Sequence, residues 1–152
     1  MKKLLLFTTL LLAFACSKDD GENQTFLQKY DGYGFVAEYD LDSEYHFFSD
    51  SEYFLKYAYL FPDGDSECAL IREGVDSEEG YDISILTNEG DTLLIEVEYT
   101  YTDGEEEVEQ LEYSINSQGD VMTLTYIYDS ERSDTDTTTY YRTSETYSDL
   151  CN

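Results

Sequence analysis

The sequence predicts an all-β protein, an antiparallel meander of eight or nine strands that closes as a barrel or packs as a sandwich. Turn residues recur at short, regular intervals along the chain. The runs between them alternate in polarity and are rich in tyrosine and in β-branched residues. Short strands separated by frequent turn signals are typical of these two architectures.

The first residues have the features of a lipoprotein signal. Met1-Lys2-Lys3 precedes an apolar segment of 11 residues from Leu4 to Phe14, and Ala15-Cys16 follows it. The segment matches the roughly 7–15 apolar residues of a signal peptide and is shorter than the ~20 needed to span a bilayer. Ala15-Cys16 resembles the bacterial lipobox, so we expect removal of residues 1–15 and lipidation of Cys16. An ordinary secretory peptide with Cys16 as a plain thiol is the alternative.

The residues after Cys16 predict where the protein is displayed. Ser17-Lys18-Asp19-Asp20 resembles the Lys-acidic export tag of Bacteroidota lipoproteins, which implies an outer-membrane lipoprotein exposed on the cell surface. Residues 16–23 are polar and acidic, so we expect a tether between the lipid and the domain. Residues 24–152 are expected to form one β-barrel domain.

The domain is expected to begin with a short helix and continue as strands. Thr25 is a candidate N-cap, Phe26-Leu27 and Tyr30 supply apolar positions, and Gly32 is a candidate stop. The polar segment from Asp129 to Asp136 is expected to be a long, mobile loop. Strands are predicted at roughly 33–39, 45–48, 53–61, 66–73, 81–87, 92–102, 107–116, 121–128 and 137–143.

The register of two hairpins follows from the requirement that apolar residues share one face. The first hairpin needs an odd-length loop such as Asp103-Gly104-Glu105, and the second a two-residue turn at Gln118-Gly119. The opposite face then carries Glu96, Glu98, Glu112, Thr123 and Thr125. The predicted pairs are Leu93 with Ile115, Ile95 with Tyr113 and Val97 with Leu111, then Ile115 with Met122, Tyr113 with Leu124 and Leu111 with Tyr126.

A short helix, then Gly32-Tyr33-Gly34-Phe35, then a meander ending in Tyr140-Tyr141-Arg142, resembles the lipocalin-like (calycin-type) proteins. The resemblance is in particular to the small lipocalin-like lipoproteins of Bacteroidota. The resemblance implies a closed β-barrel. It also implies that Phe35 and Arg142 close one barrel end, with the guanidinium over the aromatic ring. Pairing of Arg142 with an outer carboxylate is the alternative.

The composition excludes partners that need a basic surface. The chain has 8 Lys and Arg against 35 Asp and Glu, a formal charge of −27 that becomes −29 without Lys2 and Lys3. Nucleic acid and anionic lipid headgroups would be repelled. The acidity favours solubility in salty surroundings, and an acidic binding face is the alternative.

The cysteines predict one disulfide, and the other reactive residues are too few for familiar catalytic or metal sites. With Cys16 lipidated, Cys68 and Cys151 remain in an oxidising compartment, where a bridge is favoured over two buried free thiols. His46, the single histidine, lies between Tyr45 and Phe47 and is expected to point outward. We expect no zinc or iron site, no cofactor and no catalytic residues.

Acidic turns offer a weaker alternative for metal binding. The segments 63–67 and 103–107 contain clustered carboxylates, the ligand type that calcium prefers, but neither has the EF-hand spacing. Asp and Gly are also ordinary turn residues, so simple turn chemistry is favoured over weak calcium binding.

Tyrosine is unusually abundant, at 16 residues, and bears on function. Tyr99, Tyr113 and Tyr126 have the inward parity, as does Met122, so these four are candidate ligand-lining residues. Filling of the core by the same side chains is the alternative. The sequence thus indicates a lipid-anchored, non-enzymatic binding module that holds a small apolar or amphipathic ligand. The alternative is a ligand-free surface protein that contacts proteins or glycans, or inhibits a basic extracellular enzyme.

Overall fold

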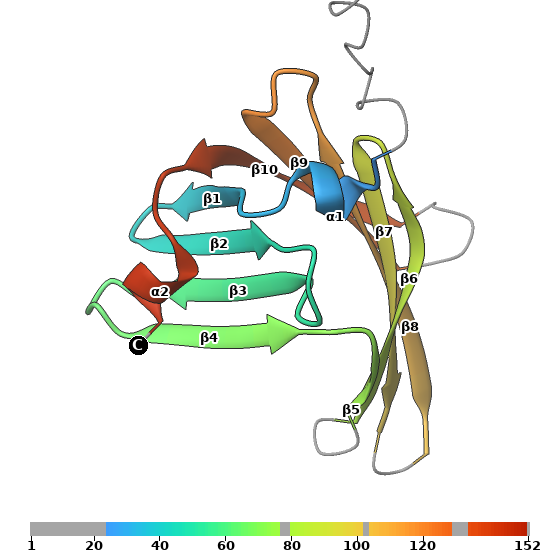
Figure 1. The fold of residues 1–152 in the computed structure, drawn as a ribbon. Coiled ribbons are helices and arrows are strands. Elements are labelled where there is room, and N and C mark those ends of the chain that lie inside the picture. The colour runs from blue at the N-terminus through green and yellow to red at the C-terminus, as the bar shows by residue number, and fades with distance from the viewer. Residues whose placement is uncertain (1–23, 77–79, 102–103, 129–133, 152) are drawn as a thin grey trace, which may run out of the picture.

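The chain folds into one antiparallel sheet of ten strands that curls into a half-barrel (Figure 1). The computed structural model describes residues 24–76, 80–101, 104–128 and 134–151. Two short helices, α1 (Phe26–Lys29) and α2 (Tyr147–Leu150), lie at the two ends of the described chain. The strands are β1 (Gly34–Tyr39), β2 (Asp42–Phe48), β3 (Leu55–Leu60), β4 (Ser66–Ile71), β5 (Gly74–Asp76), β6 (Tyr81–Glu89), β7 (Thr92–Thr100), β8 (Glu106–Ile115), β9 (Val121–Ile127) and β10 (Thr135–Thr143).

The order of strands in the sheet explains the half-barrel. Hydrogen-bonded neighbours run β4-β3-β2-β1-β10-β9-β8-β7-β6-β5. Because β1 pairs with β10, the first and last strands of the chain lie in the middle of the sheet. The two edges are β4 and β5, which follow one another in sequence. The predicted all-β class and antiparallel pairing are confirmed, and the ladder is open between β4 and β5.

Each strand segment predicted from the sequence is a strand in the structure, with ends displaced by a few residues. Two details of that prediction were wrong. The three-residue β5 was not predicted, because its glycine and acidic neighbours have the composition of a turn. β10 begins at Thr135, inside the predicted loop, because Thr135 and Asp136 pair with Ile127 and Tyr126 of β9. Residues 129–133 of that loop lie outside the described residues, as do the predicted signal peptide 1–15, Cys16 and the tether 16–23.

Helix α1 begins and ends where the sequence predicts. The Thr25 hydroxyl accepts from the backbone N–H of Gln28, and the Gln28 side chain accepts from the Thr25 N–H, which completes a capping box. Gly32 takes a φ of +77°, a conformation that glycine adopts without strain, and the chain turns there into β1. Phe26 is fully buried against the inner core, so α1 closes one end of the half-barrel.

The β8–β9 pairing is confirmed and the β7–β8 pairing was wrong by two residues. Ile115 lies opposite Met122, Tyr113 opposite Leu124 and Leu111 opposite Tyr126. In the other hairpin, Leu93 lies opposite Tyr113 and Ile95 opposite Leu111. The loop has odd length, as predicted, but it is closed by the backbone hydrogen bond from Tyr101 to Glu105. Its centre is therefore one residue earlier than expected, which shifts every pair by two and preserves the inward face.

The sheet buries apolar residues on both of its faces in the half formed by β1, β2 and β3. The inner face carries the main core, which contains Phe35 and Phe48. On the outer face, Tyr45, Phe47 and Ala58 form a second small core beneath α2 and its Tyr147 and Leu150 side chains. Strand β2 is consequently buried on both sides at its C-terminal end.

A disulfide fixes α2 on the outer face. Cys68 of β4 and Cys151, which follows α2, are bridged with a Cα–Cα distance of 6.1 Å and a sequence separation of 83 residues. The predicted bridge is therefore present, and the alternative of two free thiols was wrong. The Ser66 hydroxyl also donates to the Leu150 carbonyl oxygen at 3.2 Å. Helix α2 itself was not predicted, because four residues carry too little periodic pattern to be recognised.

Candidate functional site

His46 points into the half-barrel, so its predicted outward orientation was wrong. Only 3% of the residue is exposed. Its neighbours Tyr45 and Phe47 face outward and are covered by α2, and side chains alternate between the faces of a strand. His46 must then face inward.

The His46 ring lies among three tyrosine rings from three other strands. The ring centroids are 4.9 Å apart for Tyr140 of β10, 5.3 Å for Tyr57 of β3 and 5.6 Å for Tyr113 of β8. The contact with Tyr113 joins two strands that lie four places apart in the sheet order. This side-chain cluster therefore lies where the curled sheet faces itself.

Glu44 is the carboxylate of this region. Its Oε1 lies 2.8 Å from Nε2 of His46, and its Oε2 accepts from the Tyr39 hydroxyl at 3.3 Å. Burial raises the pKa of Glu44, but the interactions with His46 and with the nearby Tyr140 and Tyr39 hydroxyls outweigh burial, so the pKa lies below its ordinary value. Glu44 is thus ionised at neutral pH. We call the following residues the Glu44 cluster: Glu44, His46, Tyr57, Tyr113, Tyr126 and Tyr140.

The tyrosines of the Glu44 cluster remain neutral hydroxyl groups. Burial raises the pKa of Tyr57, Tyr126 and Tyr140, and the negative charge of Glu44 raises each of them further. The fully buried Tyr113 shifts in the same direction. The cluster therefore combines one carboxylate with several un-ionised phenols, a surface that is aromatic and negative at once.

Two polar atoms of the Glu44 cluster are buried without a hydrogen-bond partner among the described residues. They are Nδ1 of His46 and the hydroxyl of Tyr140. The Tyr140 hydroxyl is close enough to Glu44 to help lower its pKa, but its geometry does not form a hydrogen bond. Buried polar groups in folded proteins are nearly always paired, so unused hydrogen-bonding capacity at two atoms of one cluster is unusual.

The four predicted ligand-lining residues divide into two pairs. Tyr113 and Met122 are buried in the core, at 1% and 0% exposure, and fill it. Tyr99 and Tyr126 are only partly buried and border the same core. Three surface hollows of described residues lie elsewhere: at the β3–β4 turn near Asp63, between β4 and β6 near Tyr53, and beside α2 near Phe47. None of those three hollows includes any of these four side chains.

The predicted closure of one barrel end involves a different aromatic residue. Phe35 and Arg142 are directly opposite in the β1–β10 ladder, but Phe35 is fully buried against Phe48. The Arg142 guanidinium instead lies 3.7 Å from the ring centroid of Tyr33. The expected cation–π contact is present with Tyr33 in place of Phe35, because Phe35 belongs to the inner core and Tyr33 lies at its rim.

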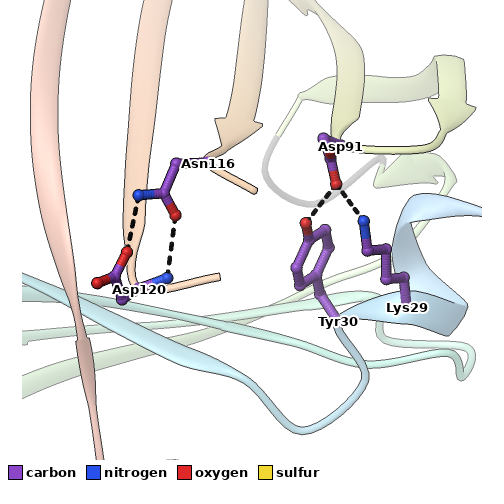
Figure 2. A network of polar contacts seen from close by, with 5 residues as sticks. All are labelled: Lys29, Tyr30, Asp91, Asn116 and Asp120. Atoms are coloured by element: carbon purple, nitrogen blue, oxygen red, sulfur yellow. Dashed lines mark hydrogen bonds and ion pairs between the residues drawn. The ribbon is translucent and has the colours of Figure 1, made fainter. Parts of the chain in front are cut away.

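Polar contacts at the α1 end hold the helix against the neighbouring strand ends (Figure 2). Asp91, in the β6–β7 turn, pairs with the ammonium group of Lys29 and accepts from the Tyr30 hydroxyl at 2.5 Å. The second pair in the figure fixes the β8–β9 turn, where the Asn116 side-chain amide donates to Asp120 at 2.7 Å. Every member of these networks has a partner, so we assign this end a structural role.

Basic side chains of the described residues lie away from the Glu44 cluster. Lys29 pairs with Asp91 at the α1 end, and Arg142 covers Tyr33. Lys56 lies over the Tyr147 ring on the outer face, and Arg72 pairs with Glu52 beyond β4. These are the four Lys and Arg residues that the structure describes. None of the four forms an ion pair with Glu44.

Within the described ranges, no group of three or more His, Cys, Asp or Glu residues is arranged to hold a metal ion. The same part of the chain contains no helix of the length and apolar character needed to span a bilayer. Comparison of the chain with protein-family models, with curated proteins and with solved structures finds no match. Functional assignment therefore depends on the chemistry of the Glu44 cluster.

Sequence reasoning missed Glu44, Tyr57 and Tyr140 as members of this site. One signal could have located Glu44. The unbroken run Tyr45-His46-Phe47-Phe48 is too apolar for a strand with one wet face, and it indicates burial on both sides. That reading turns His46 inward, and residues at the same parity on the same strand, including Glu44, turn inward with it.

Proposed function

We propose that this protein is a lipid-anchored binding module that holds a small amphipathic molecule on the inner face of its half-barrel. The lipoprotein signal ending at Cys16 supports anchoring to the outer membrane, and the Lys-acidic segment after it supports display on the cell surface. The resemblance to lipocalin-like lipoproteins supports a ligand-binding role for the curled sheet.

The Glu44 cluster is the observation that carries the proposal. If the inner face contributed only to stability, we would expect apolar side chains along all of it. The α1 end has this composition, with Phe26, Phe35 and Phe48 in the inner core. At the Glu44 cluster the inner face instead carries a carboxylate, partly exposed tyrosines and two unpartnered buried polar atoms. Polar groups that converge in an aromatic setting are characteristic of small-molecule sites.

Native mass spectrometry of the full-length protein, purified from its own host in mild detergent, tests the binding function. We expect a co-purifying small molecule in addition to the lipid anchor. A Tyr126→Ala variant should lose that molecule, and Tyr141→Ala, which changes an exposed tyrosine on the outer face of β10, should retain it. Protein that carries no small molecule in any preparation would contradict the binding function.

Membrane fractionation tests the anchor separately. A Cys16→Ser variant should leave the membrane fraction and appear in soluble form, since it has no thiol for lipid attachment. Ser17→Ala is the matched control and should remain in the membrane fraction. Cys16→Ser protein that stays fully membrane-bound would contradict lipid anchoring.

Contact with other proteins is a second candidate function, and the open sheet edges favour it. Strand β4 is exposed along most of its length, and Leu70 and Val75 are 44% and 67% exposed. An exposed edge can accept a strand from a partner. A Leu70→Pro variant, which blocks pairing at β4, should abolish recovery of any partner in pull-downs from envelope or host extracts. Equal recovery by the variant would exclude edge pairing.

A further inference from the structure

We propose that the molecule held at the Glu44 cluster is an organic cation, an amine or ammonium compound with an apolar chain or ring. The ammonium group would pair with the Glu44 carboxylate, and the apolar part would lie against Tyr57 and Tyr126. This inference rests on the binding function proposed above and specifies the class of ligand.

The inner face beyond the Glu44 cluster carries negative charge. Because side chains alternate between the two faces of a strand, several carboxylates of β2, β4, β8 and β10 face inward as Glu44 does. They lie farther from the α1 end than Glu44. They are Asp42, Glu67, Glu107, Glu109 and Asp136. Burial and the nearby Glu107 raise the pKa of Glu109, which indicates mutual repulsion among these groups. An anionic ligand would add to that repulsion, and a cationic ligand would relieve it.

Among the described residues, no Lys or Arg neutralises Glu44, and His46 pairs with it as an ion only when the imidazole is protonated. The four basic side chains that the structure describes have partners at the α1 end, on the outer face or beyond β4. His46 supplies one hydrogen bond to Glu44. A carboxylate offers about four acceptor positions, of which His46 and Tyr39 occupy two. Glu44 therefore retains acceptor capacity, and an ammonium group has three donors to fill it.

Aromatic rings surround the Glu44 carboxylate. The tyrosine rings of the cluster carry negative faces and stay un-ionised, so they attract a cation without repelling its apolar part. Such sets of aromatic rings around a cation are how proteins recognise ammonium ligands. Tyr57 and Tyr126 are the two cluster tyrosines that remain partly exposed, so they are the rings that a ligand can reach.

A buried hydroxyl beside Glu44 has unused hydrogen-bonding capacity. The Tyr140 hydroxyl is buried beside the carboxylate and has no partner. This observation is independent of the number of acidic residues, because it concerns a neutral group that folding has removed from water. A donor brought to Glu44 by a ligand would let the Tyr140 oxygen act as a neighbouring acceptor, and the cost of burying it unpaired would fall.

Calorimetric titration of the full-length protein in detergent with three probes of nearly the same shape tests this inference. The probes are the phenethylammonium ion, neutral 2-phenylethanol and the 3-phenylpropionate anion. We expect the ammonium ion to bind at least about tenfold more tightly than either of the others, as a charge-assisted hydrogen bond in a partly buried site requires. Calcium ion is the competitor, and it should not displace the ammonium probe.

Two variants locate the effect. Glu44→Gln should abolish the preference for the ammonium ion, whereas Glu98→Gln, the same charge change on the exposed outer face, should leave the preference intact. Because loss of the Glu44 carboxylate could disturb folding, Tyr126→Leu is the second variant. It should weaken ammonium binding by about 2- to 30-fold and affect the alcohol less, since it removes a cation–π partner but keeps an apolar surface.

The outcomes separate the inference from the function on which it rests. Equal binding of the three probes, or an unchanged preference in Glu44→Gln, would overturn the organic cation as ligand. Displacement of the ammonium ion by calcium would also overturn the organic cation as ligand. Failure of the ammonium ion to bind measurably would overturn it as well. In each of these cases a co-purified molecule in native mass spectrometry would leave the binding function standing. Absence of both a co-purified molecule and probe binding would overturn the two together.

Discussion

At the scale of single residues, Tyr30 and Tyr140 are both almost fully buried, yet only Tyr30 has a partner for its hydroxyl. A buried hydroxyl that donates to a carboxylate adds to stability. One without a partner has lost its hydration and gained no bond in exchange. The hydroxyl group should therefore stabilise the folded protein at Tyr30 and destabilise it at Tyr140.

Phenylalanine at each position measures that difference. Tyr140→Phe should leave the free energy of unfolding unchanged or raise it by a few tenths of a kcal/mol, whereas Tyr30→Phe should lower it by about 1 kcal/mol. Urea denaturation of the ligand-free protein, followed by circular dichroism, gives both values. An equal loss in the two variants would mean that the Tyr140 hydroxyl is hydrogen-bonded in solution.

Asp91 should make stability depend on pH in the acid range. Hydrogen bonds from Lys29 and Tyr30 lower its pKa below the ordinary value. A pKa lowered by folding contributes stability that is complete above the unfolded-state pKa and is lost as the pH falls through the folded-state pKa. Asp91→Asn should therefore be less stable than the wild type near pH 6, by at most about 1 kcal/mol because the pair is largely exposed.

The difference between Asp91→Asn and the wild type should shrink as the pH falls below the ordinary aspartate pKa, and it should disappear once the folded-state carboxyl is protonated. Urea denaturation at several pH values measures the trend. Glu89→Gln, a nearby exposed change on the same hairpin, should show no such convergence. A constant difference between Asp91→Asn and the wild type across the acid range would contradict the assigned ion pair.

At the scale of elements, α2 and the Cys68–Cys151 bridge together cover the outer face of β2. The helix has four residues, too few to be stable alone, since isolated helices of that length do not form in water. The disulfide keeps it in place, and its side chains bury Tyr45 and Phe47. This outer core is also what turns His46 inward, so the covalent bond contributes indirectly to the candidate site.

Removal of the bridge should affect both stability and the outer face. The Cys68→Ser, Cys151→Ser double variant should lose up to about 4–5 kcal/mol, the chain-entropy value for a loop of this size. Amide hydrogen exchange should speed up along β2, and reduction of the wild type with dithiothreitol should reproduce the effect. Unchanged exchange at Tyr45 and Phe47 would show that α2 stays in place without the disulfide.

The hairpins show which element-level properties local sequence controls. In β8–β9 the apolar alternation and a glycine-containing turn agree, and the predicted pairs are correct. In β7–β8 the alternation predicts the inward face, but several glutamates near the loop fit equally well in registers two residues apart. Turn closure by Tyr101 and Glu105 decided between them.

At the scale of the whole molecule, charge repulsion opposes the compact state. The formal net charge is −27, and the described basic residues neutralise few of the carboxylates. Like charges held close together in a folded protein destabilise it relative to the expanded chain, and dissolved salt screens them. Stability should therefore depend strongly on ionic strength.

Thermal unfolding in sodium chloride tests this dependence. The Tm should rise as the salt concentration increases from about 0.01 M to about 1 M, over which the Debye length falls from about 30 Å to about 3 Å. Chloride is preferred to sulfate because sulfate also strengthens the burial of apolar groups. A Tm that falls or stays constant would mean that local ion pairs, and not overall repulsion, dominate the electrostatics.

The sequence by itself determined the all-β class, the strand segments, the capped helix α1 and the Cys68–Cys151 pair. These depend on local properties: alternation, turn residues, a capping box and the parity of cysteines. The tertiary structure alone decided the open edges at β4 and β5, the outer core beneath α2 and the inward orientation of His46. These depend on contacts between segments far apart in sequence. Glu44, His46, Tyr113 and Tyr140 come together because β1 joins β2 to β10 in the sheet and because the curl brings β8 back to β2.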